Sequence, residues 1–106
     1  MKGTAKILAI YQGQASGPAV VAIVAKGSLQ AGMESVAPKD IILSIKLLLS
    51  QDLSILEQVH SSQQAVIIVF TAASALLLDQ LVGQSVEFDD RQSIKRMDTA
   101  LEPSTI

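Results

Sequence analysis

The sequence contains no cysteine and no tryptophan, and its only aromatic residues are Tyr11, Phe70 and Phe88. Without cysteine the chain forms no disulfide, has no thiol nucleophile and binds no metal through sulfur. Its single histidine, His60, is the one imidazole available for metal binding or general-base catalysis. The absence of cysteine suits a reducing compartment, so we expect a cytoplasmic protein.

Charged residues are also scarce. They make up 17% of the 106 residues, against about 25% in an average soluble protein. Eight lysines and arginines face ten aspartates and glutamates, so there is no basic excess to collect nucleic-acid phosphates without sequence preference. Apolar residues make up 49% of the chain. That content indicates either a compact domain with an aliphatic interior or an apolar surface covered by another subunit or domain.

Long hydrophobic runs are missing as well. A membrane-spanning helix needs about 18 consecutive apolar residues, and the longest runs here are interrupted by Lys26, Ser44, Lys46 and Ser50. Residues 1–4 carry no apolar secretory segment. We therefore expect no contact with a membrane.

Runs of apolar and β-branched residues, separated by residues that favour turns, predict a mainly extended chain. The polar stretch 12–18 is an expected loop. The stretch 36–40 is an expected break, because Pro38 also keeps Ala37 out of helical conformation. The expected strands lie at residues 4–11, 19–25, 41–49, 65–70 and 85–88.

Two further segments are ambiguous. Residues 54–60 have apolar side chains at helical spacing but are too few for a stable helix, so a turn or short strand that tucks Ile55 or Leu56 inward fits them best. Residues 72–82 fit either a helix or a loop that ends at Gly83. With the short strand included, about six strands are expected.

The apolar pattern of the strands leaves a second architecture open. Residues 7–10 and 20–24 are apolar on both faces, which is typical of a parallel sheet covered by helices. A small α/β sandwich is therefore the alternative fold. A small barrel whose outer wall is covered by a partner gives the same pattern.

The segment Lys26–Met33 is the most informative part of the chain. Gly27 and Gly32 bracket Leu29, and glycine adopts positive φ without a Cβ penalty. The chain is thus expected to turn, place one apolar anchor and turn again. We expect corners at Gly27, Gly32 and Gly83.

The order of these strands and turns along the chain resembles that in the small β-barrel that follows the GTPase domain in translation factors. That barrel is the second domain of elongation factors of the Tu type, and it has relatives in initiation factors. The resemblance covers about residues 3–88 and implies an all-β, Greek-key barrel. It is carried by the glycine-led second strand (17–21), the G-x-L-x-x-G turn (27–32), the leucine pair with an acid (55–57), the penultimate strand (65–69) and the closing turn (82–86).

Two sequence features depart from the family pattern. Residues 61–64 replace a turn that usually contains glycine, and Ala22 or Ala25 stands in place of a second-strand glycine. No G-x-x-x-x-G-K-[ST] sequence occurs, so no nucleotide site of that kind is expected. The resemblance implies a non-enzymatic binding module that contacts a ribosomal surface, a transfer RNA or a GTPase domain.

The residues alone indicate no catalytic centre. His60 is expected in an exposed loop, and Ser16 and Ser28 lie beside glycines without the G-x-S-x-G elbow. We expect no enzymatic activity, no cofactor and no metal site. If the barrel touches RNA, backbone amides of the two glycine-containing loops are the expected contacts. The candidates are Gln12, Gly13, Gln14, Gly17, Lys26, Gly27 and Ser28.

The chain changes character after residue 88, which we take as the end of the barrel. In residues 89–106 the charge rises, and Ile94, Met97 and Leu101 follow at helical spacing. This tail is expected to form a short helix, with disorder or docking on a partner as alternatives. The high apolar content and low charge also favour a second function, an assembly module in which the barrel wall joins copies into a homo-oligomer.

Overall fold

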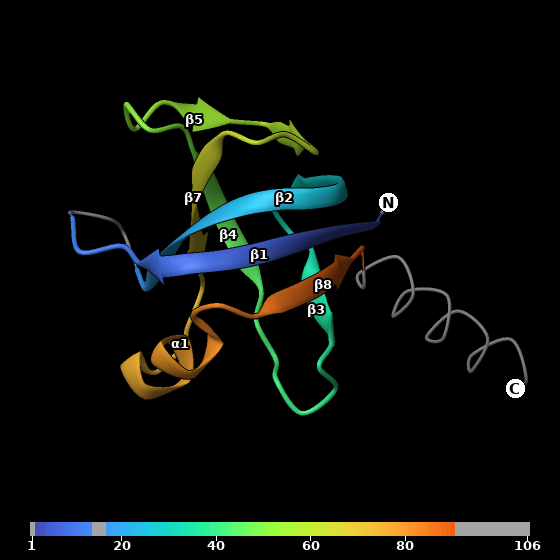
Figure 1. The fold of residues 1–106 in the computed structure, drawn as a ribbon, viewed down its shortest axis with the longest axis vertical. Helices are drawn as coiled ribbons and strands as arrows, with labels where there is room; N and C mark the ends of the chain where they lie inside the picture. The colour runs from blue at the N-terminus through green and yellow to red at the C-terminus, as the bar shows by residue number, and fades with distance from the viewer. Residues whose placement is uncertain (1, 14–16, 91–106) are drawn as a thin grey trace, which may run out of the picture.

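The computed structural model of the chain describes residues 2–13 and 17–90. Most of them lie in strands, which curl around one another beside a single short helix (Figure 1). The elements in chain order are β1 (Lys2–Ile10), β2 (Ala19–Gln30), β3 (Glu34–Ala37), β4 (Ile45–Leu49), β5 (Ile55–Leu56), β6 (Gln58–His60), β7 (Ala65–Phe70), α1 (Ala75–Leu81) and β8 (Ser85–Asp89).

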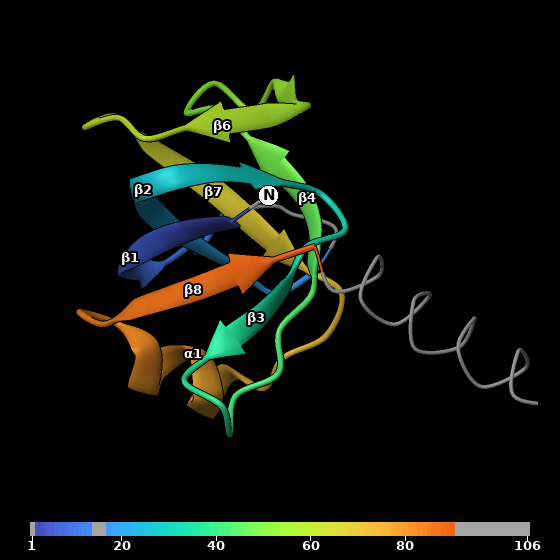
Figure 2. The same cartoon turned by 90° about the vertical axis from the view of Figure 1, so that its right-hand side faces the viewer.

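The strands form one curled antiparallel sheet in the order β3-β8-β1-β2-β7-β4-β5, and β6 pairs with the second half of β2 (Figure 2). β1 and β2 make a hairpin, whereas β8 and β7, which come much later in the sequence, flank it on either side. Alternate residues of β2, namely Val20, Ala22 and Val24, point into the core, as expected for a strand with one face turned inward.

Hydrogen bonds between the two ends of this curl bring β3 against the chain segment before β4. The Ser35 amide donates to the Leu43 carbonyl at 2.8 Å, and the Ile45 amide donates to the Met33 carbonyl at 2.9 Å. The buried Ser35 hydroxyl adds a bond to the Ile41 carbonyl at 2.7 Å. These bonds satisfy backbone groups that would otherwise be left at a sheet edge, and they give the sheet its barrel shape.

The barrel interior is aliphatic except for two phenylalanines. The Phe70 and Phe88 rings are both buried and stack with their centroids 6.3 Å apart. They lie among aliphatic side chains from most strands and from α1, including Ala5, Ile7, Val20, Leu29, Leu43, Ile45, Leu48, Ile68, Leu78, Leu81 and Val86. Apart from the two rings and Met33, the core consists of Val, Ile, Leu and Ala, which agrees with the aliphatic interior indicated by the sequence.

The all-β, barrel-like fold predicted from the sequence is confirmed. Every strand pairing is antiparallel, and the one helix in residues 2–13 and 17–90 has seven residues, so the α/β sandwich is excluded. Apolar residues on both faces of β2 and β7 therefore reflect an apolar outer wall rather than a helix-covered parallel sheet.

Several predicted boundaries are wrong. β2 does not end before Gly27 but runs on to Gln30, so Gly27, with φ +66°, bends a continuous strand instead of making a corner between strands. Residues 34–37 form β3, whereas a break was expected from residue 36, and β4 begins only at Ile45. Gly32 and Gly83 do lie in turns, with φ of +96° and +87°.

The ambiguous segments are now assigned. Residues 55–60 form two short strands, in which Leu56 packs against the core and Ile55 stays 70% exposed. α1 forms within the 72–82 segment because the Ser74 hydroxyl accepts a hydrogen bond from the Leu77 amide at 3.1 Å and caps its first turn. The predicted tail helix with Ile94, Met97 and Leu101 lies outside the described residues.

Candidate functional site on the outer surface of the barrel

An apolar row crosses the outer face of five neighbouring strands. Its members are directly opposed pairs: Ala9 on β1 faces Val21 on β2, Val21 faces Ile67 on β7, Ile67 faces Leu49 on β4, and Leu49 faces Ile55 on β5. Ile67 and Leu49 are shielded by their neighbours, with 4% and 7% of their surface exposed. Ile55, at the end of the row, is 70% exposed.

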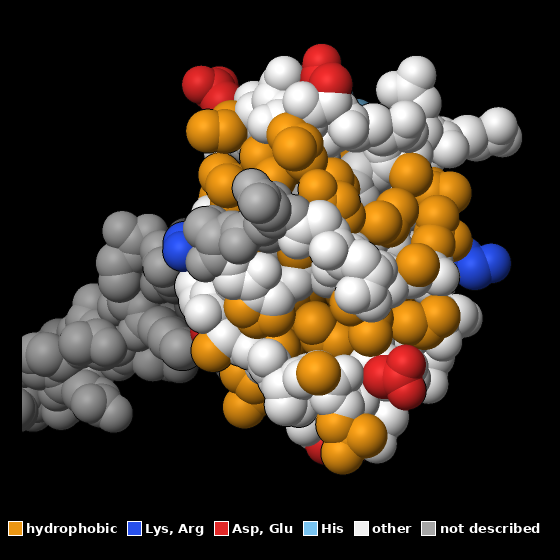
Figure 3. Space-filling view, turned by 90° about the vertical axis from the view of Figure 1, so that its left-hand side faces the viewer, with side chains coloured by type: hydrophobic (Ala, Val, Ile, Leu, Met, Phe, Trp, Pro, Cys, Tyr) orange, Lys and Arg blue, Asp and Glu red, His pale blue; other side chains and the backbone are white. Residues whose placement is uncertain are grey.

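A second, shorter row lies beside the first. Ala19 on β2 faces Val69 on β7, and Val69 faces Leu47 on β4. With the first row they make an outer cluster separate from the barrel core, which we call the apolar wall: Ala9, Ala19, Val21, Leu47, Leu49, Ile55, Ile67 and Val69. From the side on which β1 ends, hydrophobic side chains cover a broad area and charged ones lie mostly at its margins (Figure 3).

The wall is nearly free of charge for a reason that is visible in the sequence. β7 has no charged residue, and neither does the first half of β2. Depletion of charge at a central apolar patch, with charged residues around it, is the composition that protein interfaces show. Ala19, Leu49, Ile67 and Val69 are buried within the fold, so another protein surface can contact the wall only through its exposed or half-buried members, Ala9, Val21, Leu47 and Ile55.

The loop between β1 and β2 borders this wall. Tyr11 packs against the outer cluster. A Cβ added to Gly17 would come within 3.0 Å of the Phe70 carbonyl oxygen and 3.7 Å of a Val69 methyl group, so Gly17 lies directly on β7. Gln12 and Gly13 are exposed beside it, and Gln14 lies outside the described residues.

The other predicted binding residues lie at the opposite end of the β1–β2 hairpin. Lys26 is separated from Val20 by roughly 20 Å along β2, at about 3.3 Å per residue. Lys26 and Gly27 line a separate hollow of about 240 Å³ with Lys2, Gly3, Thr4 and Glu87. The structure therefore does not bring the two predicted loops together into one site.

His60 lies in β6 rather than in the loop expected for it, although it is exposed as predicted. Its Nδ1 shares a hydrogen bond of 2.8 Å with the hydroxyl of Ser28, the residue opposite it on β2. A serine–histidine pair acts as a nucleophile only when a third group orients the imidazole. Among the described residues, no other hydrogen bond reaches the His60 ring. The same part of the chain has no cluster of three His, Cys, Asp or Glu side chains placed to bind a metal.

The turn between β4 and β5 is a site that sequence reasoning missed. The Ser50 hydroxyl donates a hydrogen bond to the Asp52 carboxylate and accepts one from the Ser54 amide at 3.1 Å. Leu53, between them, has a φ of +69°, which is uncommon for a residue with a Cβ and is typical of positions under local constraint. The S-x-D-x-S spacing of residues 50–54 was the available signal, since Ser and Asp side chains commonly close turns on their own backbone.

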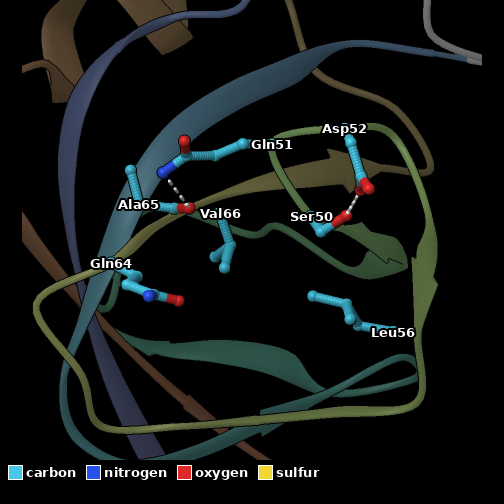
Figure 4. A pocket seen from close by; sticks show the side chains of 7 residues that line it. All are labelled: Ser50, Gln51, Asp52, Leu56, Gln64, Ala65 and Val66. Carbon is cyan, nitrogen blue, oxygen red and sulfur yellow. Dashed lines mark hydrogen bonds between the residues drawn. The ribbon is translucent and has the colours of Figure 1, made fainter.

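A hollow of about 430 Å³ lies beside this turn, between it and the turn that leads into β7. The side chains of Leu56 and Val66 point into it, and Gln51 reaches across to the Ala65 carbonyl at 3.2 Å (Figure 4). Gln64 and Asp52 stand at its rim (Figure 4).

The hydrogen bonds of this turn make a prediction about pH. Hydrogen bonds from the Ser50 hydroxyl and from Ser54 hold the pKa of Asp52 below its ordinary value. Because the pKa is lower in the folded chain than in the unfolded one, ionised Asp52 adds stability above about pH 4, and this is lost as the pH falls through the folded pKa. Asp52→Asn is expected to be less stable than wild type near about pH 6 and less so near about pH 2, because the contribution of the ionised carboxylate is lost as the pH falls through the folded pKa.

Urea unfolding at the two pH values measures this difference. Glu57→Gln is the matched control, because Glu57 is an exposed carboxylate outside the hydrogen-bonded turn. An Asp52→Asn difference that stays the same at both pH values would show that ionisation of Asp52 adds nothing to folding.

No protein-family description matches the sequence, and no curated protein does either. Among residues 2–13 and 17–90, no helix has the length and apolar character needed to cross a membrane.

Proposed function

We propose that this chain is a non-enzymatic binding module, similar in role to the second domain of translation elongation and initiation factors, that acts in the cytoplasm by docking its apolar wall on a partner. The partner is a GTPase domain or a ribosomal component. The observation that supports this best is the apolar row from Ala9 to Ile55, which crosses five strands on the outer side of the sheet and is exposed at both of its ends.

A partner that covers the exposed apolar side chains of the wall gains binding free energy. Burying apolar surface contributes about 25 cal/mol per Å², and Ile55 alone offers most of a side chain to a partner because it is 70% exposed. The neighbouring β1–β2 loop, with Gln12, Gly13 and Gly17, supplies backbone amides at the edge of the wall. RNA contact through these amides is the second element of the proposal.

The test is affinity capture from a native extract with matched variants. Ile55→Lys puts a charge at the end of the wall, while Ile42→Lys puts the same charge at an isoleucine that is 76% exposed in the β3–β4 connection. Wild type and Ile42→Lys are expected to retain ribosomal components or a GTPase. Ile55→Lys should retain about fivefold less, which corresponds to about 1 kcal/mol. Mass spectrometry and RNA quantification measure the retained material.

Two outcomes contradict the proposal. Equal capture by both lysine variants would remove the apolar wall as the docking surface. Loss of captured RNA in Lys26→Ala but not in Gln12→Ala would move the RNA contact to the opposite end of the hairpin. Gly27 is unsuitable for this test, because its substitution is expected to disturb the fold itself.

The same wall supports a second candidate function, an assembly module that forms a homo-oligomer. A patch that is apolar across its whole width can face a copy of itself about a two-fold axis. Light scattering distinguishes the candidates: oligomers that dissociate in Ile55→Lys but not in Ile42→Lys favour assembly. A wild-type monomer at all concentrations excludes it.

A further inference from the structure

The open hollow between the β4–β5 turn and the β6–β7 turn is large enough to hold a small ligand. Its floor is made of Leu56 and Val66, which also pack against the barrel core, together with Ala65. Its volume of about 430 Å³ lies within the range of about 300–1,000 Å³ that is usual for small-molecule pockets. Such pockets are often found at the mouths of β-barrels.

The rim of the hollow is polar and selects for a particular chemistry. The Ser50 hydroxyl already donates its proton to Asp52, and Gln51 Nε2 already donates one of its two hydrogens to the Ala65 carbonyl. The Gln64 side-chain amide makes no hydrogen bond among the described residues. The polar groups still able to bind are of both kinds: the second Asp52 oxygen and the amide oxygens of Gln51 and Gln64 accept, while the Gln64 amide nitrogen and the second Nε2–H of Gln51 donate.

The rim of the hollow carries negative charge only. Of the described residues that line the hollow, Asp52 alone is charged. Its hydrogen bonds with Ser50 and Ser54 favour the ionised carboxylate, so it carries a negative charge at neutral pH. A carboxylate beside spare acceptors attracts a group that offers several N–H donors and a positive charge.

We propose that this hollow binds an ammonium or guanidinium group carried on a short apolar stem, with the head at Asp52 and Gln64 and the stem on Leu56 and Val66. The cation donates hydrogen bonds to the Asp52 carboxylate and the Gln64 amide oxygen. The stem covers the apolar floor, so affinity requires both parts of the ligand. This site is separate from the apolar wall and goes beyond the docking function proposed above.

Two sources share this ligand chemistry, a free small amine and a lysine or arginine side chain of a protein. We would titrate the full chain with n-butylammonium, n-butanol and butyrate while recording backbone amide spectra by NMR. Butylammonium is expected to shift the amides of residues 50–56 and 64–66 in a saturable way. Butanol should bind about tenfold more weakly, and butyrate should not bind. Repeating the titration with Nα-acetyl-lysine amide and with a lysine-containing peptide distinguishes the two sources.

Three variants test the assignment. Asp52→Asn removes the charge, and Gln64→Ala removes one acceptor without touching the hydrogen-bonded turn. Each is expected to weaken butylammonium binding, by about tenfold for Asp52→Asn, while Glu57→Gln leaves it unchanged. If Asp52→Asn fails to fold, Gln64→Ala decides. Equal binding of butanol and butylammonium, or shifts spread over the whole barrel, would overturn the proposal.

Discussion

Alanine in place of Gly3 or Gly27 is expected to lower the free energy of unfolding by roughly 3 kcal/mol or more, the sum of an overpacked contact and, at Gly27, a forced left-handed backbone. The two glycines face each other where β1 crosses β2. A Cβ on Gly3 would lie 2.7 Å from the Ser28 carbonyl carbon and 2.9 Å from a Leu29 methyl group. A Cβ on Gly27 would collide with the Lys2 carbonyl oxygen at a φ of +66°.

Gly32→Ala is the matched control for this result. Gly32 also has a positive φ, +96°, but no atom lies within 4 Å of the added Cβ. Gly32→Ala should therefore lower the free energy of unfolding only by the cost of placing a residue with a Cβ at positive φ, about 1–2 kcal/mol. Thermal unfolding measures the difference, since about 1 kcal/mol shifts the melting temperature by roughly 4–8 °C in a chain of this size. Equal losses at Gly27 and Gly32 would mean that backbone conformation, and not the close approach of β1 and β2, sets the requirement for glycine.

Truncating either buried phenylalanine is expected to have an equally large effect. Phe70→Ala and Phe88→Ala should each cost about 3–5 kcal/mol, because each removes a fully buried ring and leaves a cavity between β7 and β8. A domain of this size is typically stable by only about 5–15 kcal/mol, so either variant will populate the unfolded state at moderate temperature.

Combining Phe70→Ala with Phe88→Ala separates the cost of the cavities from the contribution of the contact between the two rings. The two rings stack at a centroid distance of 6.3 Å, so the second truncation should cost about 0.5–1.5 kcal/mol less than the first. Leu76→Ala is the control, because Leu76 is 69% exposed on α1 and should change stability by less than about 0.5 kcal/mol. Strictly additive losses at Phe70 and Phe88 would show that the rings contribute independently.

The candidate site was predictable only in part. The sequence placed Gln12, Gly13 and Gly17 in a surface loop, and the apolar excess indicated a covered wall. The expected strand at residues 19–25 already put Lys26, Gly27 and Ser28 at the end remote from that loop, but the sequence did not indicate that they continue β2 instead of forming a turn. The chain continues as a strand through Gly27 because residues 28–30 of β2 pair with β6, a segment about thirty residues later in the sequence.

The sequence by itself determined the extended character of the chain, its aliphatic core and the turns at Gly32 and Gly83, because these depend on local pattern and on backbone freedom. Only the tertiary structure decided that Ala9, Val21, Ile67, Leu49 and Ile55 form one row, and that Asp52 and Gln64 line the same hollow. Cross-strand register joins residues dozens of positions apart, and no local preference of any one strand specifies which residue of another strand it will face.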